Sequence, residues 1–317
     1  MNPSVDYANL YKDFSAKLRK KIFRKPNVVE ARDDFAYLAK TLAAEDSFEY
    51  AAIFTLGKAR CEANVHNYPG EASALMEAGR LFLKAEENLQ ITSAFSVGEF
   101  LECFTSCCLK AAKIFESIEL LTSAASCYIY VGDNLMKFER FSEAIAVLSH
   151  AADIFCRDAP RSMHVLFKCM KCQLFTRDYP GALNTILKMQ TLIQDACETH
   201  GYEIELFLDD LHRIEVFRVL LVLTVLPPKS EELVGDGQLS LLAYTDDAKE
   251  SAKTSVIDYM DRDLVLLLRS LVMSYQLEDV NGFELTATLL QPYVDYAQRK
   301  VLCDILTNLI HPPDDTL

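Results

Sequence analysis

The sequence predicts an all-α protein, and three observations lead to that class. Apolar residues recur at helical spacing along almost the whole chain. No convincing run alternates apolar and polar residues between turn signals, so no β-strand is expected. Glycine supplies only 10 of the 317 residues, about half its usual share of roughly 7%. This scarcity predicts few sharp turns and no glycine-rich phosphate loop.

The chain opens with an amphipathic helix. Its apolar residues follow the spacing i, i+3, i+4, i+7 and i+11 and therefore share one face: Tyr7, Leu10, Tyr11, Phe14 and Leu18. Pro26 is expected to end this helix, because proline disrupts a helix interior. Asn27 with Glu30 three residues later resembles a capping box, which predicts that a second helix starts near Val28.

A helical hairpin is expected between residues 121 and 155. Small and apolar residues have the spacing of a tetratricopeptide-like helix pair: Tyr128, Val131, Gly132, Leu135, Phe141, Ala144, Leu148 and Ala151. The small residues let two helices approach closely, and Phe141 is expected to fill the space between them.

The start of the second helix in this pair recurs along the chain. The aromatic-to-alanine offset of Phe141 and Ala144 returns 38 residues later in Tyr179-Pro180-Gly181-Ala182, and Tyr68-Pro69-Gly70 stands 73 residues before Phe141. These spacings are slightly longer than the tetratricopeptide period of about 34 residues. We therefore expect a degenerate, tetratricopeptide-like solenoid of stacked antiparallel hairpins, whose faces remain free for binding.

Three regions are expected along the chain. Residues 1–226 form the helical array, residues 227–254 a polar and acidic connection, and residues 255–317 the C-terminal helices that continue or cap the array. The runs Val219–Leu226 and Leu264–Met273 are apolar nearly all round and must be covered. Either they are buried inside this chain or they form a large protein–protein interface.

Charge and hydropathy exclude several classes of protein. The net charge of −14 argues against nucleic acid as a partner, because phosphate binding needs a basic face. The longest stretch without a charged residue has thirteen residues, Leu120–Gly132, and is too short to span a membrane. Met1–Tyr11 lacks the apolar core of a secretion signal. The ten cysteines are therefore expected to be thiols in a reducing compartment.

Catalytic motifs are scarce. The sequence has no GxGxxG, P-loop, GxSxG or HExxH motif, and its six histidines are scattered. Cys169 and Cys172 form one CxxC on an expected helix, without a second pair to complete a zinc site. Core packing is the favoured interpretation, as it is for Cys107 and Cys108, and a thiol or metal enzyme is the alternative. We expect a protein that is not an enzyme, with no cofactor and no metal.

Charges are unevenly distributed. Residues 1–25 carry seven basic and two acidic side chains, whereas residues 203–263 carry 14 acidic and six basic ones. Lys17, Lys20, Lys21 and Arg24 would share one face of the first helix. That face is either ordinary solvated surface or a docking site for an acidic partner or an anionic membrane.

Five strings together resemble the forty-kilodalton huntingtin-associated protein family. In order, they are Lys17-Leu18-Arg19-Lys20-Lys21-Ile22-Phe23-Arg24-Lys25-Pro26-Asn27-Val28-Val29-Glu30-Ala31; Pro69-Gly70-Glu71-Ala72 with Ala78-Gly79-Arg80-Leu81-Phe82-Leu83; Arg177-Asp178-Tyr179-Pro180-Gly181-Ala182-Leu183; Arg218-Val219-Leu220-Leu221 ending in Pro227-Pro228; and Arg269-Ser270-Leu271-Val272-Met273. They cover the chain from about Lys17 to its end. The glycine-, alanine- and proline-rich segments of other family members are missing here, so any role of those segments does not transfer.

The resemblance implies a helical solenoid that binds huntingtin, a very large HEAT-repeat protein, and is held between its helical domains. It also implies a cytoplasmic protein linked to early endosomes, as an effector that helps an endosomal Rab GTPase recruit huntingtin and shift vesicles between microtubules and actin. Whether the contact with the Rab GTPase is direct, and whether a nuclear pool exists, stays open.

The candidate partner-binding residues lie in the first and third of these strings: Lys17, Arg19, Lys20, Lys21, Arg24, Lys25, Arg177, Asp178 and Tyr179. A rival interpretation is a vesicle adaptor of the soluble-attachment-protein kind, which also uses tetratricopeptide-like hairpins but engages SNARE bundles and a disassembly ATPase.

Overall fold

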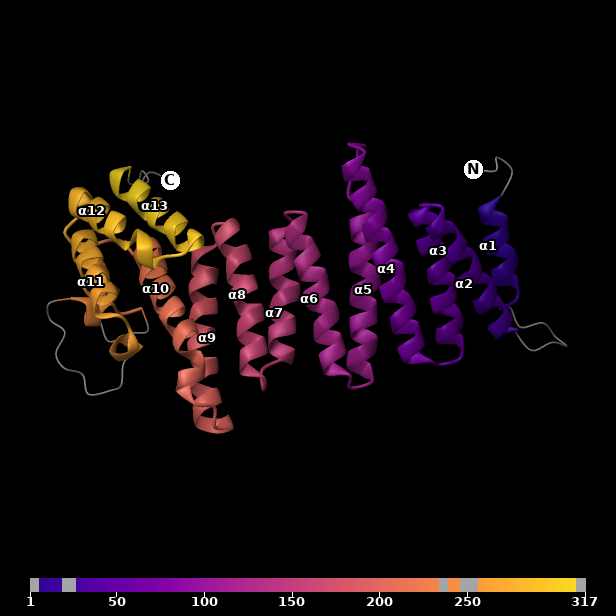
Figure 1. Ribbon diagram of the computed structural model, residues 1–317, viewed down its shortest axis with the longest axis horizontal. Helices are drawn as coiled ribbons and strands as arrows, with labels where there is room; N and C mark the ends of the chain where they lie inside the picture. The colour runs from indigo at the N-terminus through magenta and orange to yellow at the C-terminus, as the bar shows by residue number, and fades with distance from the viewer. Residues whose placement is uncertain (1–5, 19–26, 234–238, 246–255, 312–317) are drawn as a thin grey trace. The chain divides into compact units, whose positions relative to one another are not determined.

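The computed structural model describes residues 6–18, 27–233, 239–245 and 256–311, and these residues form an all-helical protein without a β-strand (Figure 1). The all-α class expected from the sequence is confirmed. The α-helices of the described residues are α1 Tyr7–Ala16, α2 Val28–Ala44, α3 Phe48–Asn64, α4 Tyr68–Ile91, α5 Glu99–Ser117, α6 Leu121–Lys137, α7 Phe141–Ile154, α8 Ala159–Phe175, α9 Tyr179–His200, α10 Leu208–Val225, α11 Arg262–Gln276, α12 Val280–Leu290 and α13 Tyr296–Ile310. Short 3₁₀ turns are η1 Ile204–Phe207, η2 Glu231–Leu233, η3 Leu242–Tyr244, η4 Val256–Tyr259 and η5 Gln291–Tyr293.

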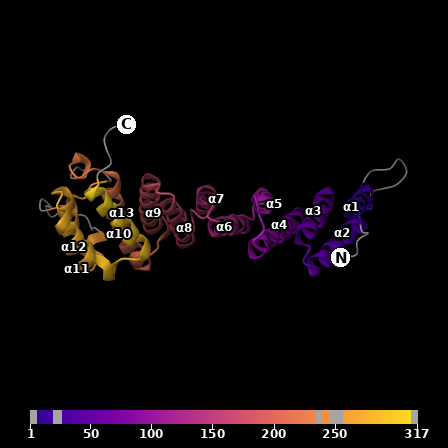
Figure 2. The same cartoon turned by 90° about the horizontal axis from the view of Figure 1, so that it is seen from above.

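The chain divides into two compact units. The first unit holds the residues up to Phe138 together with Asp153–Phe155, and the second holds Glu139–Ala152 and the residues from Cys156 onward. The division at residues 227–254 stays a prediction. In the first unit, each helix from α2 to α6 packs on its neighbour in the sequence, and short connections make successive helices antiparallel (Figures 1 and 2).

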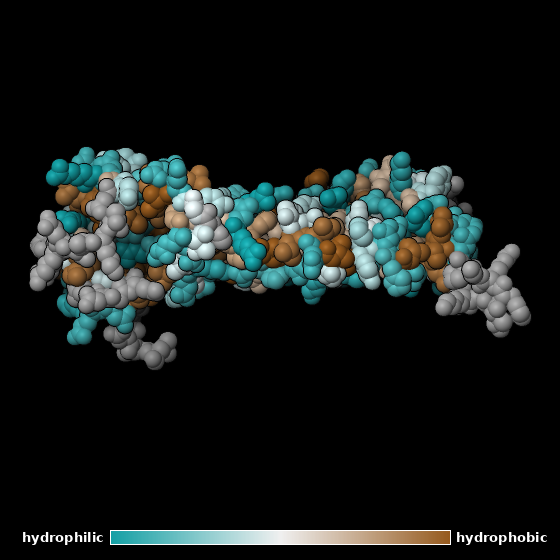
Figure 3. Space-filling model, turned by 90° about the horizontal axis from the view of Figure 1, so that it is seen from below, coloured by the Kyte–Doolittle hydropathy of each residue, from teal (hydrophilic) through white to brown (hydrophobic). Residues whose placement is uncertain are grey.

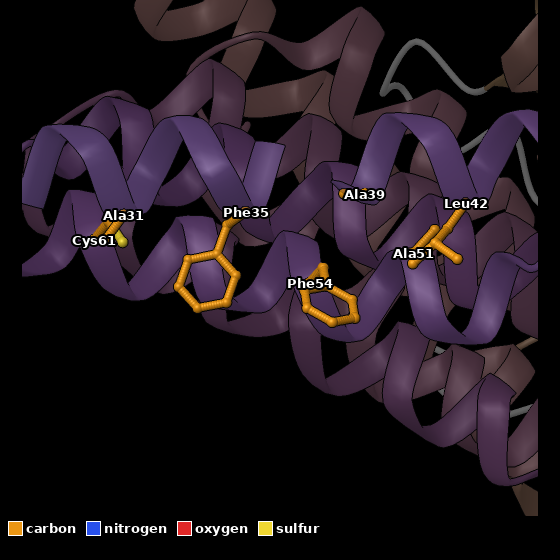
Figure 4. Close-up of a cluster of buried hydrophobic side chains, with 7 residues drawn as sticks. All are labelled: Ala31, Phe35, Ala39, Leu42, Ala51, Phe54 and Cys61. Carbon is orange, nitrogen blue, oxygen red and sulfur yellow. The ribbon is translucent and has the colours of Figure 1, made fainter. Parts of the chain in front are cut away.

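The core at the start of the first unit is built on two phenylalanines. Phe35 of α2 and Phe54 of α3 are fully buried, with ring centroids 6.2 Å apart (Figure 4). Gly57 makes room for them, since a Cβ there would lie 2.4 Å from the Phe35 ring. The apolar stripe of α1 packs on this cluster, and Phe14 meets Phe35 edge-to-face at 5.4 Å. The expected face of the opening helix is therefore confirmed.

The end of this first helix differs from the expectation. Helix α1 ends at Ala16, with Lys17 as its C-cap, so Pro26 does not end it. The Lys17 carbonyl instead accepts a 3.3 Å hydrogen bond from the backbone N–H of Asn27. Asn27 also caps α2, where its side chain accepts from the Glu30 backbone N–H at 3.3 Å, which confirms the start at Val28.

Sharp turns connect many of the helices, contrary to the expectation from scarce glycine. In each of five turns a non-glycine residue takes the left-handed conformation with φ between 55° and 60°, and the next residue precedes a new helix: Asp46, His66, Glu119, Arg177 and Glu278. The residue after each of them donates a backbone hydrogen bond of 2.9–3.0 Å to the carbonyl five positions earlier. This is the Schellman pattern, in which glycine is usual but not required.

The recurring helix starts are confirmed at α4 and α9. Asn67 precedes α4, and Asp178 precedes α9; each side chain accepts a hydrogen bond from the backbone N–H three residues later. That third residue is Gly70 or Gly181, and a Cβ there would lie within 2.4 Å of the capping side chain. Glycine at this position lets the cap fold closely over the first turn, although caps of the same kind form at α2 and α8 with Glu30 and Arg161 in that place.

The expected apolar helices occupy the second unit. Helix α10 is buried nearly all round, including every residue from Val219 to Leu223, and contacts α9, α11 and α13. Helix α11 is one-sided instead, because Leu268 is fully buried whereas Leu266 is 55% exposed. Burial inside this chain accounts for the run at Val219.

Phe141, expected to fill the space within its own hairpin, packs against the next helix in the chain. Its ring stacks on Phe175 of α8 at 4.7 Å, with an interplanar angle of 4°.

Residues expected to form a polar connection also contribute to the core, since Leu233, Leu241 and Tyr244 are fully buried. No helix among the described residues is long and apolar enough to cross a membrane.

Candidate interaction surface

The basic group predicted near the N-terminus is not one helical face. Lys17 follows α1, and its Nζ lies 2.7 Å from Glu30 Oε1 and 2.5 Å from Asp34 Oδ2 of α2. These hydrogen bonds, with Asp34 the stronger influence, raise the pKa of Lys17. Its charge therefore joins α1 to α2 within the chain. The other predicted residues of this group, Arg19, Lys20, Lys21, Arg24 and Lys25, lie outside the described residues.

The second predicted group performs structural roles at the start of α9. Arg177 is exposed in a left-handed turn, and the Asp178 side chain accepts from the Gly181 backbone N–H at 3.0 Å. The Tyr179 hydroxyl donates a 2.6 Å hydrogen bond to Asp304 Oδ2 of α13. Partial burial and the Asp304 carboxylate raise the pKa of Tyr179 to about 12. The structure thus places Tyr179 beside a surface groove that the sequence alone did not indicate.

The groove lies between α8 and α13, with α10 at one end. Its larger part has a volume of about 580 Å³, and an adjoining apolar pocket has about 50 Å³. The two parts share Lys171, Leu174, Tyr296 and Ala297. The residues of α8 that line it have helical spacing and share one side of that helix: Pro160, His164, Phe167, Lys168, Met170, Lys171, Leu174 and Phe175.

Charges balance at the α10 end of the groove. The Arg213 guanidinium lies 4.7 Å from the centre of the Phe167 ring, a cation–π contact, and 3.1 Å from Asp295 Oδ2. Asp210 lines the same part of the groove. Burial raises the pKa of Asp210, and the nearby Arg213 partly opposes that rise. Lys168 of α8 lines this part as well, so two carboxylates stand beside two cationic side chains.

The opposite end is aromatic and cationic. Tyr296 is 80% exposed and Phe175 is 46% exposed. Lys300 of α13 holds its Nζ 5.2 Å from the centre of the Phe175 ring. Lys171 of α8 lines the groove beside them. Tyr179 and Asp304 close the pocket below this end through their hydrogen bond.

The four cysteines that the sequence analysis singled out pack as small apolar residues. Cys169 and Cys172 are buried on α8 and form no disulfide, and the Cys169 sulfur lies 3.3 Å from the Ser149 hydroxyl of α7. Cys107 and Cys108 are also buried. Burial raises the pKa of Cys107 to about 11 and that of Cys108 further, so their reactive thiolate forms are disfavoured. Within the described ranges, no three His, Cys, Asp or Glu side chains cluster as a metal site.

A buried ion pair organises the second unit, and sequence reasoning missed it. Arg218 and Glu215 of α10 form two hydrogen bonds of 2.7 and 2.9 Å. The Tyr244 hydroxyl donates to Glu215 at 3.0 Å, and Arg218 donates to the Ser240 carbonyl at 3.0 Å. The i, i+3 pair of opposite charges inside an apolar run was the available signal.

Arg269 extends this arrangement from α11. Its Nη2 donates to the Ala243 carbonyl at 3.3 Å. Arg218 and Arg269 open the fourth and fifth strings of the family resemblance, and both bind the backbone of residues 240–243. Those strings therefore hold a non-helical segment against α10 and α11.

Exposed apolar side chains occur in separate groups. One group lies at the end of α4 and just after it, where Ile91 is 80% and Phe95 89% exposed, and another lies on α12, where Leu285 is 64% and Leu289 54% exposed. On the face shown in Figure 3, hydrophobic and hydrophilic side chains alternate over both units. Apolar contact surface is thus available on both units.

Comparison with known proteins gives full-length relatives. No family model matches the chain. The 40-kDa huntingtin-associated protein of Mus musculus is 29% identical over 359 aligned positions, which cover 97% of this chain and 93% of the relative. The protein of the same name from Rattus norvegicus is 28% identical over the same shares of both chains. Similarity that extends over nearly the whole of both proteins confirms the resemblance of this chain to the 40-kDa huntingtin-associated proteins.

Proposed function

We propose that this protein is a non-enzymatic partner subunit of huntingtin. The similarity over 97% of the chain to proteins named for their association with huntingtin carries the proposal. Its helices form a tetratricopeptide-like solenoid of stacked hairpins, and the solenoid docks between the HEAT-repeat domains of huntingtin and stabilises their arrangement. The packed hairpins of each unit and their Schellman turns support this architecture.

In this proposal, apolar contacts supply most of the affinity for huntingtin, and charged side chains determine the orientation in which the two proteins dock. Helix α10 is covered within the chain, so the affinity comes from exposed groups such as Phe95 and Leu285. The uneven charge distribution orients the partner, because residues 1–25 carry a net +5 and residues 203–263 a net −8. In the cell, the protein is cytoplasmic and associates with early endosomes, where a Rab GTPase recruits it with huntingtin.

Co-expression with full-length huntingtin tests the proposal. We expect a stoichiometric complex in size-exclusion chromatography, and separate elution of the two chains would refute it. Retention of SNARE proteins and a disassembly ATPase, with no huntingtin, would favour a vesicle adaptor instead. Immunoprecipitation with the early-endosomal Rab GTPase in its GTP-bound form tests the endosomal role, and purified components then distinguish direct from indirect contact.

The predicted basic contribution needs a separate variant. Lys20→Glu, Lys21→Glu and Arg24→Glu together are expected to weaken the complex at moderate salt. Lys17 is left out because it is already paired inside the chain. Lys40→Glu, Lys113→Glu and Arg157→Glu form the matched control, since they make the same charge change at exposed sites. Equal binding by both triple variants would show that Lys20, Lys21 and Arg24 do not contribute to huntingtin binding through their charge.

A further inference from the structure

The cationic end of the groove differs from the other charged sites of the second unit. Arg213 and Arg218 both have carboxylate partners. Within the part of the chain that the structure describes, neither Lys171 nor Lys300 forms an ion pair, although both line the same pocket. The carboxylate between them, Asp304, accepts the Tyr179 hydroxyl. Two ammonium groups are therefore available on opposite walls of one groove.

Apolar surface lies beside these ammonium groups. The pocket between them is floored by Leu174 and Val301 and bordered by Phe175 and Tyr296. Tyr296 is 80% exposed and Phe175 46% exposed, which leaves two aromatic rings unprotected by their own chain. Aromatic rings at the edge of a pocket commonly anchor an inserted side chain.

The dimensions suit an elongated ligand. The lining positions on α8 run from Pro160 to Phe175, a distance of about 22 Å at 1.5 Å per residue. A segment of about seven extended residues or four helical turns would cover that length. Because Asp210 and Asp295 lie at the Arg213 end, an anionic ligand gains most at the Lys171 end.

We propose that this groove is a docking site for an acidic linear segment of a partner protein. One apolar or aromatic side chain of that segment enters the pocket between Phe175 and Tyr296. Its flanking carboxylates pair with Lys171 and Lys300. A protein segment is favoured over nucleic acid, because the site offers one small apolar pocket beside only two ammonium groups, whereas a phosphate backbone is bound by a longer row of cations. The site stands apart from the huntingtin proposal, since its test contains no huntingtin.

Fluorescence anisotropy with the full chain tests the groove. The probe is a labelled ten-residue peptide with six Asp or Glu residues around one Phe and one Leu. We expect saturable binding that is weakened about tenfold or more when Gln and Asn replace the acids, because two charge pairs are lost. Added salt should weaken binding in the same direction. A peptide with its acids intact but Phe and Leu replaced by Ser should also bind less tightly.

Variants locate the binding. Lys171→Glu with Lys300→Glu is expected to reduce affinity about tenfold or more, and Tyr296→Ala to reduce it about threefold or more. Lys40→Glu with Lys113→Glu makes the same charge change on the first unit and is expected to alter affinity less than about twofold. The altered side chains of the test pair are exposed, so each variant should keep its melting temperature, which circular dichroism checks.

Several outcomes would overturn the proposal. One is the absence of binding at about 200 µM peptide, where even a weak docking motif is detected. Another is equal loss of affinity in the two double-lysine variants, which would indicate nonspecific charge attraction. Binding of single-stranded DNA or of vesicles containing phosphatidylserine that depends on Lys171 and Lys300, without binding of the acidic peptide, would assign the groove to a different ligand.

Discussion

The Tyr179 hydroxyl donates a 2.6 Å hydrogen bond to the Asp304 carboxylate across 125 positions of the chain. This contact joins the N-terminus of α9 to α13 and closes the groove below Lys171. Tyr179 was predicted as a partner-binding residue, and nothing in the structure tests that role. Its position shows that a substitution there would alter folding stability as well as any contact with a partner.

Tyr179→Phe is expected to destabilise the protein by about 1–2 kcal/mol, because a half-buried hydrogen bond to a carboxylate is lost while the ring is kept. Urea unfolding followed by circular dichroism measures the difference. Tyr202→Phe is the matched control, since that ring packs on Phe207 and should tolerate the change within about 0.5 kcal/mol. A loss of unfolding free energy no larger than in the control would contradict a stabilising role for the hydrogen bond from Tyr179 to Asp304.

Stability is expected to fall in alkali. Burial is the main cause that raises the pKa values of Tyr128, Tyr179 and Tyr275 to about 12 from the ordinary 10.0. Each folded-state pKa is raised, so the stabilisation is complete below pH 10 and is lost as the pH rises from about 10 to about 12. Urea unfolding at several pH values across this window measures the slope. Replacing all three tyrosines by Phe should reduce it, and an unchanged slope would exclude them as the cause.

Arg218→Met is expected to cost about 3–5 kcal/mol, because it leaves the buried Glu215 carboxylate without its charged partner. The double variant Arg218→Met with Glu215→Leu should lose less, since it removes both charges. Hydrogen exchange should also become faster at Leu241 and Tyr244, whose segment Arg218 holds at the Ser240 carbonyl. A double variant less stable than Arg218→Met would contradict the assignment of the loss to an unpaired carboxylate.

Glycine at the left-handed turns is expected to stabilise the protein. Arg177→Gly and Glu278→Gly should each raise the unfolding free energy by about 0.5–1 kcal/mol, because they relieve a left-handed penalty of about 1–2 kcal/mol at some cost in chain entropy. Thr288→Gly, inside α12, should lower it by about 0.5–1 kcal/mol. Thermal melting of the three variants checks the sign. A loss of stability at both turns would show that their side chains make compensating contacts.

Local pattern predicted the helices and their starts well. The stripe of α1 and the cap at Asn27 depend on spacing within a few residues, and both occur as expected. The predicted end of α1 was wrong because tertiary contacts determine where this helix ends. The Lys17 ammonium pairs with Glu30 and Asp34, and the Lys17 carbonyl accepts a hydrogen bond from the Asn27 backbone N–H. These partners lie beyond residue 25, so the local sequence of the first helix does not indicate them.

The groove could not be predicted for a related reason. Its walls come from α8, α10 and α13, so Lys171 and Lys300 become neighbours of one pocket only after folding. The left-handed turns were missed because scarcity of glycine was taken as scarcity of turns. In the structure, paired backbone hydrogen bonds hold residues such as His66 and Glu119 in that conformation, and they offset its cost.

These Schellman turns also decide where the chain tolerates changes in length. Each leaves no spare residue between the end of one helix and the cap of the next. One residue inserted within a helix would rotate the rest of that helix by about 100°, and the alanines of the next helix would turn from their neighbour toward water. Insertions and deletions should therefore be confined to longer connections, such as the one from Thr92 to Gly98 between α4 and α5 and the one between α10 and α11.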